Sequence, residues 1–315
     1  MKTKEKLRMG FRWVCFALLL TATVFRLADV WISAQEEEAP LPVVETNLAQ
    51  WEYPTVYYSL PERNEVSLTA QDAAYVQVDN RSGLQIDIPA LLTRELPFDP
   101  SVEGPLILIV HTHATEAYTM TEGARYEESS AYRTPDTEHN VVRVGRQVCQ
   151  SLNELGIETI HDTTLNDMPG YENAYERTAR VIEAYLEEYP TIQMVIDIHR
   201  DAVAAADGSE LAMSTQLEGE RAARLLLVMG TNSAGLEHPA WESNLSLALQ
   251  MQALCEKDAP GLFRELSLRA ERYNQHLTPC SILLEVGTAG NTLEEALRSA
   301  EYFARQLSAL LLCRE

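Results

Sequence analysis

Hydrophobic residues after residue 104 alternate between short apolar runs and longer amphipathic stretches. An apolar run of about four to eight residues between turn signals is typical of a buried strand, whereas hydrophobic residues at three- and four-residue steps indicate a helix face. The predicted strands are 106–110, 157–161, 192–199, 224–230 and 281–287. The predicted helices are 141–155, 175–189, 241–256 and a final helix that begins at a capping box formed by Thr292 and Glu295.

Strands that alternate with helices predict an α/β fold, with a mostly parallel or mixed central sheet that has helices on both faces. In such folds, ligands bind outside the carboxyl ends of the strands. His111, His113, His199 and Glu285 each stand at or just after the carboxyl end of an apolar run. We therefore expect these side chains to meet at one edge of the sheet.

The N-terminal part of the chain has a basic flank followed by an apolar run from Trp13 to Phe25. This pattern is typical of a signal peptide or signal anchor. Since no small-residue cleavage site follows, we predict an uncleaved anchor in 1–35, with a cleaved signal as the alternative. The protein would then be a single-pass cell-membrane protein, with a linker over 36–60, a small membrane-proximal subdomain over 61–104 and a catalytic domain over 105–315, all outside the cytoplasm.

The composition narrows the function classes. A formal net charge of -22 argues against a nucleic-acid partner bound through its phosphates. The sequence contains no glycine-rich phosphate loop and no nucleophile-elbow serine, so it gives no sign of a nucleotide cofactor. The five cysteines do not have the spacing of a zinc knuckle, and a disulfide between Cys280 and Cys313 stays open.

The candidate chemistry is that of a metal hydrolase. His113 and Glu116 have His-x-x-Glu spacing, and His199 ends another strand. Two histidines and one glutamate form a three-ligand zinc site with a fourth position for water. Glu285 is the candidate general base, because a carboxylate after a buried run is costly without a role or a partner. Singly, each residue is better explained as a loop residue or, for Glu285, as the partner of an arginine such as Arg269 or Arg272. Their common position at one sheet edge favours the site.

Weaker candidates surround these residues. Asp201, like Asp197, could accept a hydrogen bond from His199, or either could pair with Arg200. Asn274 and His276 stand in a polar loop before the last strand, and we predict that they contact the substrate or a developing oxyanion.

Seven stretches carry a further signal: ILIVHTHATEAY, NVVRVG, HDTTLND, VIDIHRDA, VMGTN, RYNQHL and LLEVGTAGNTLEEA. In the same order, they resemble the stage II sporulation protein P family of endospore-forming bacteria. The resemblance extends over about two thirds of the chain, and no single motif carries it.

The resemblance implies a membrane-anchored peptidoglycan hydrolase. Members of that family cut the amide between N-acetylmuramic acid and L-alanine and the peptide cross-links between stems, by zinc-activated water. They act in septal wall remodelling during engulfment, with the sporulation proteins D and M. The catalytic part is similar to zinc amidases and, more distantly, to zinc carboxypeptidases. By position, His113 and His199 match the zinc-binding histidines, and Glu285 matches the general base.

Two ligand positions stay open at this stage. Glu116 fits the carboxypeptidase spacing, whereas in the amidases the ligand glutamate comes further along the chain, where Glu138 stands. His111 competes with His113 for the first histidine position.

Two other functions stay open as well. A zinc carboxypeptidase acting on stem peptides would need a basic residue to hold a terminal carboxylate, and Arg200 or Arg272 could serve. A non-catalytic wall-binding scaffold would keep the fold. Such a protein typically lacks the general base or a metal ligand, whereas this sequence has a candidate residue for each ligand and for the base.

Overall fold

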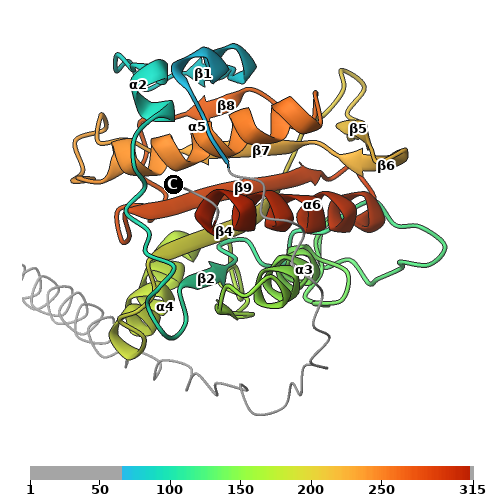
Figure 1. The fold of residues 1–315 in the computed structure, drawn as a ribbon. Helices are drawn as coiled ribbons and strands as arrows, with labels where there is room; N and C mark the ends of the chain where they lie inside the picture. Colours follow the sequence, from blue (N-terminus) through green and yellow to red (C-terminus); the bar gives the residue numbers. More distant parts are fainter. Residues whose placement is uncertain (1–65, 313–315) are drawn as a thin grey trace, which may run out of the picture. The chain divides into compact units, whose positions relative to one another are not determined.

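A seven-stranded sheet organises residues 66–312, the part of the chain that the computed structural model describes (Figure 1). The strand order is β1-β8-β7-β9-β4-β2-β3. Neighbouring strands are parallel except β7 and β9, which are antiparallel, so the sheet is mixed. The strands are β1 (Val78–Asn80), β2 (Ile107–Val110), β3 (Thr159–His161), β4 (Met194–Asp201), β7 (Leu225–Met229), β8 (Leu266–Leu268) and β9 (Cys280–Thr288). A separate hairpin comprises β5 (Ser214–Leu217) and β6 (Glu220–Ala223).

Four longer helices lie at the positions that the hydrophobic periodicity predicts. They are α3 (Val141–Glu154), α4 (Ala174–Glu188), α5 (Trp241–Asp258) and α6 (Leu293–Leu312). The capping box before α6 is confirmed, since Glu295 N–H donates to Thr292 Oγ1 at 3.2 Å and Thr292 N–H donates to Glu295 Oε2 at 3.4 Å. Asn140 caps α3 by accepting a hydrogen bond from the N–H of Val142.

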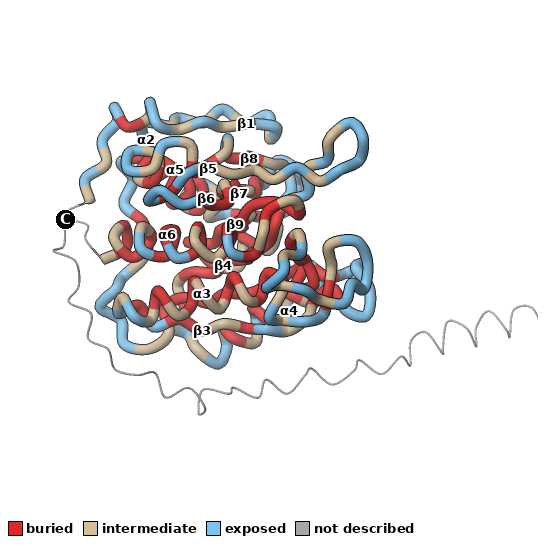
Figure 2. The backbone as a smooth tube through the Cα atoms, turned by 90° about the vertical axis from the view of Figure 1, so that its right-hand side faces the viewer, coloured by how far each residue is buried: buried red, intermediate tan, exposed pale blue. Residues whose placement is uncertain are grey.

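The two faces of the sheet are covered differently. Helices α3, α5 and α6 share one hydrophobic core with the sheet, to which β2 contributes Ile107 and Ile109. Leu108 and Val110 are not part of that core, because successive strand residues point to opposite faces; on their face α4 contacts β2. Figure 2 shows the buried residues concentrated in the strands and on the inner sides of the helices. The predicted fold, a mixed sheet with helices on both faces, is therefore confirmed.

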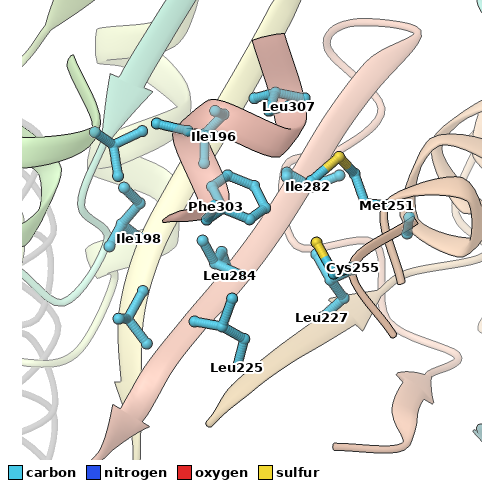
Figure 3. Close-up of a cluster of buried hydrophobic side chains, with 14 of the residues drawn as sticks. Ile196, Ile198, Leu225, Leu227, Met251, Cys255, Ile282, Leu284, Phe303 and Leu307 are labelled. Atoms are coloured by element: carbon cyan, nitrogen blue, oxygen red, sulfur yellow. The ribbon is translucent and has the colours of Figure 1, made fainter. Parts of the chain in front are cut away.

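Phe303 of α6 lies at the centre of the large core, against strands β4, β7 and β9 (Figure 3). Its side chain is 0% exposed. Phe303→Ala would leave a cavity that a packed core closes only in part, so we expect the free energy of unfolding to fall by about 3–5 kcal/mol. Urea unfolding measures this change. Leu236→Ala, at a residue that is 54% exposed, should change stability by less than about 0.5 kcal/mol.

Residues 66–104 add a strand to the same sheet, because β1 pairs with β8. The short helices η2 (Ala70–Tyr75) and α2 (Ile88–Leu92) pack on α5, and the described residues cluster as one unit. The predicted anchor (1–35) and linker (36–60) lie outside the described residues. Within 66–312, no helix combines the length and the apolar character that a membrane crossing needs. Cys280 is buried and forms no disulfide with another cysteine of residues 66–312; Cys313, its possible partner, lies outside the described residues.

Candidate metal centre

Three neighbouring parallel strands, β9, β4 and β2, end at the same edge of the sheet. His113 lies in the turn that follows β2, His199 lies in β4, and Glu285 lies in β9. His199 and Glu285 are register partners, so their side chains point to the same face. The structure thus brings the three strand-end residues together, as the order of the predicted elements indicates.

His113, Glu116 and His199 form a buried group whose potential ligand atoms all lie within 4.8 Å of one another. Glu116 lies between the two imidazoles, with Oε1 3.5 Å from His113 Nδ1 and Oε2 3.4 Å from His199 Nδ1. Two imidazole nitrogens and one carboxylate are the donor set of a three-ligand catalytic zinc site. The residues present therefore fit zinc.

Surrounding cations hold Glu116 in its ionised form. Arg133 Nη2 lies 3.2 Å from Oε1, and the backbone N–H of Arg200 donates to Oε2 at 3.2 Å. Burial alone would raise the pKa of Glu116, but hydrogen bonds from His113 and His199 and the charges of His199 and Arg200 lower it well below its usual value. A ligand carboxylate is thus available without a proton to displace.

Asp197 fixes the other side of His199. Its Oδ1 lies 3.0 Å from His199 Nε2, although that nitrogen has no well-aligned hydrogen-bond acceptor within the described residues. Asp197 itself accepts hydrogen bonds from the N–H and the hydroxyl of Thr112, at 2.8 and 2.6 Å. Burial alone would lower the pKa of His199, but the charge of Asp197 raises it well above the usual value. A carboxylate behind a ligating histidine orients the ring. Asp201, the other candidate, instead pairs with Arg264 at 2.5 Å.

Glu285 has the environment of a general base. Its Oε2 is buried without a hydrogen-bond partner, and none of the ion pairs found within residues 66–312 involves it, so the alternative that an arginine neutralises it finds no support. The pKa of Glu285 is raised to about 8, mainly by burial; the charge of His199 opposes the rise, and the charges of Glu116 and Asp201 add to it. A carboxyl that is desolvated next to a potential metal site is typical of catalytic acids and bases.

A cleft of about 610 Å³ reaches Glu285 from the same face of the sheet. Its floor consists of strand residues that alternate with the core positions, and Tyr175 and Tyr273 stand beside them.

The Tyr171 ring stacks on His113 at a centroid distance of 4.2 Å, and its hydroxyl lies 3.3 Å from His113 Nδ1. These tyrosines are not among the site residues predicted from the sequence. The only signal was the four-residue spacing of Tyr171 and Tyr175 at the start of a helix, which by itself indicates no more than a shared helix face.

The alternative ligands lie elsewhere. The His111 ring is buried against α3, where its Nδ1 lies 2.9 Å from the carbonyl oxygen of Ile198 and its Nε2 lies 2.8 Å from His161 Nε2. Burial lowers the pKa of His111 to about 4, so the ring is neutral. Glu138 is exposed and pairs with Arg146 at 2.7 Å. The group in the described residues that could hold a metal includes neither His111 nor Glu138.

The remaining candidates are not brought to the cleft as substrate ligands. Asn274 Nδ2 donates to the carbonyl of Tyr175 at 2.7 Å, and neither Asn274 nor His276 lines the cleft. The guanidinium of Arg200 is buried and donates to the backbone carbonyls of Ala117 and Tyr132. Arg200 therefore stabilises the turn that bears Glu116, and its guanidinium does not line the cleft, where a terminal carboxylate of a substrate would lie.

Sequence comparison assigns the chain to a protein family. The family model of stage II sporulation protein P (SpoIIP) matches residues 44–308. The chain is 27% identical over 263 residues to stage II sporulation protein P of Bacillus subtilis (strain 168), which covers 80% of this chain and 59% of that relative. The chain therefore spans about three fifths of the length of the relative.

Three solved amidases are similar in structure to part of this chain, each with 14% sequence identity. The N-acetylmuramyl-L-alanine amidase Ami1 from Mycobacterium smegmatis has a TM-score of 0.39 and covers 65% of this chain and 96% of its own. Ami1 from Mycobacterium abscessus, in its apo form, has a TM-score of 0.38 over 67% and 100%. The amidase AmiC2 of Nostoc punctiforme has a TM-score of 0.38 over 65% and 96%. Similarity at this level assigns no role to any residue.

Proposed function

This chain belongs to the stage II sporulation protein P family, since the family model matches residues 44–308, and on that premise we propose that it is a zinc-dependent peptidoglycan hydrolase. Its substrates would be the amide between N-acetylmuramic acid and L-alanine and the peptide cross-links between stems. The observation that supports this most directly is the buried group of His113, Glu116 and His199 beside Glu285, whose Oε2 has no hydrogen-bond partner among residues 66–312. A wall-binding scaffold would have no use for this arrangement.

The four residues of the site have separate roles in the proposed amide hydrolysis. His113, Glu116 and His199 would hold zinc, which supplies Lewis-acid polarisation of an amide carbonyl and lowers the pKa of a water toward about 7. Glu285 takes the proton of the attacking water and then donates it to the leaving amine. A pKa raised to about 8 suits a group that must both accept and release a proton near neutral pH.

Other residues shape the site around this reaction. Tyr171 and Tyr175 place their rings against His113, the first by stacking and the second edge-on with a centroid distance of 5.5 Å. These rings exclude water from one side of the His113 imidazole. Asp197 keeps Nε2 of His199 turned away from the group, so that Nδ1 faces Glu116.

The proposal also has parts that rest on the resemblance and on family membership. Residues 1–35 would anchor the protein in the cell membrane with the catalytic part outside the cytoplasm. The hydrolase would then act on septal peptidoglycan during engulfment, with the sporulation proteins D and M as partners.

Digestion of purified peptidoglycan by the zinc-loaded full chain tests the activity. We expect mass spectrometry to find free stem peptides that begin with L-alanine, glycan strands without stems, and fewer cross-linked stems. Two other results would contradict the proposal. Release of terminal D-residues alone would indicate a carboxypeptidase, and binding to peptidoglycan without any cleavage would indicate a scaffold.

A further inference from the structure

The cleft extends well beyond Glu285, across the sheet toward its β1 edge. Leu226 and Glu285 are register partners, as are Val228 and Ser267, and all four line the cleft. Because register partners point to the same face, the floor of the cleft is one continuous face of β9, β7, β8 and β1. The parts of a substrate that lie away from its reacting bond at Glu285 could therefore contact this continuous surface.

Arginines gather on this surface, although the chain has a formal net charge of -22. The cleft is lined by Arg81, Arg224, Arg264 and Arg269. Two of them are neutralised, because Arg81 pairs with Asp79 at 2.7 Å and Arg264 pairs with Asp201 at 2.5 Å. Arg224 donates its Nε and Nη2 hydrogens to two backbone carbonyls, both at 2.8 Å.

Arg269 differs from the other three. Its Nε donates to Ser267 Oγ at 2.6 Å, which fixes the direction of the side chain. No ion pair between Arg269 and a carboxylate is found within residues 66–312, so its two terminal nitrogens stay available. A guanidinium fork with both terminal nitrogens available matches a carboxylate geometrically, with two parallel hydrogen bonds. The arginines considered from the sequence, Arg200 and Arg272, do not line the cleft.

The spacing from Glu285 to Arg269 fits a short extended peptide. Across the sheet, Glu285 of β9 and Arg269 after β8 are two strand spacings apart, which at about 4.8 Å each is about 10 Å. Along the strands, the register separates the two residues by four positions, which is about 13 Å. The two Cα atoms are thus about 16 Å apart, which an extended peptide covers in about four or five residues.

We propose that Arg269 binds the terminal carboxylate of a stem peptide whose scissile amide lies at Glu285. Arg269 is then a specificity-determining residue that favours stems of four or five residues with a free terminal carboxylate. This inference rests on the proposed function, because it takes its substrate from the reaction proposed for Glu285.

Two soluble muramoyl peptides that differ only in the terminal group, carboxylate or carboxamide, test the inference with the zinc-loaded full chain. We expect the parent to prefer the carboxylate by about ten- to a hundredfold in kcat/KM. Arg269→Gln should lose this preference through a higher KM for the carboxylate substrate, with the carboxamide substrate unaffected. Arg305→Gln on α6, outside the cleft, removes the same charge and should keep the preference. A preference that survives in Arg269→Gln, or that the parent lacks, would overturn the inference.

Binding separates this inference from the proposed activity. Calorimetry with Glu285→Gln measures the affinity for both peptides without turnover, and the carboxylate peptide should bind more tightly by a similar factor. Adding Arg269→Gln should remove the difference. If the parent cleaves neither peptide, the proposed function fails, whereas equal affinities for the two peptides would refute the role of Arg269 whether or not cleavage occurs.

Discussion

Glu285→Gln is expected to lower the rate of peptidoglycan amide cleavage by about 100- to 10,000-fold, which is the range that general base catalysis contributes. Glutamine has nearly the same shape as glutamate, so the packing around β9 should persist. It cannot accept a proton from water or return one to the leaving amine. The substitution also removes a carboxyl whose pKa burial raises to about 8, so we expect no loss of folding stability.

Release of stem peptides at saturating peptidoglycan measures this effect, and the zinc content and far-UV circular dichroism verify that site and fold are intact. Glu301→Gln, on the exposed side of α6, is the matched control and should cleave like the parent. If Glu285→Gln retained the parental rate with zinc bound, another group would have to be the base, and the assignment would be wrong.

Much of the fold could be predicted because long elements repeat their pattern. Helix α3 contains enough turns for the helical period to stand out, and strand β9 contains an apolar run long enough to be recognised. β1 and β8 contain three residues each, which is too short for a period, and they form because neighbouring strands offer hydrogen bonds. The antiparallel direction of β7 against β9 was likewise beyond reach, since a hydrophobic run does not record its direction.

The sequence predicts those site residues that stand at the carboxyl ends of strands. Strand order brings His113, His199 and Glu285 to one edge, but the sequence could not separate His113 from His111, because residues two apart share a face in an extended segment. The chain leaves β2 at Val110 and turns, so His111 faces α3 while His113 faces the cleft side. Contacts made between loops, such as Tyr171 on His113, leave no trace in local periodicity.

Zinc content should separate the ligands from their alternatives. His113→Ala and Glu116→Gln are each expected to weaken zinc binding by more than about 100-fold, because even residues that only orient a ligand contribute about 10- to 100-fold to metal affinity. Cleavage should be lost together with the metal. In contrast, Glu138→Gln and His111→Gln should retain zinc, since Glu138 is exposed beside Arg146 and His111 contacts His161.

Elemental analysis after dialysis, and titration of the metal-free full chain with zinc, measure these affinities. His111→Gln replaces a ring that packs closely against α3, where a Cβ added at Gly145 would lie 2.5 Å from His111 Nε2. We therefore expect this variant to unfold more easily while binding zinc normally, and Glu138→Gln to match the parent in both respects. Zinc retained by His113→Ala but lost by His111→Gln would transfer the first ligand to His111. The same reversal between Glu116→Gln and Glu138→Gln would transfer the carboxylate ligand to Glu138, in the loop before α3.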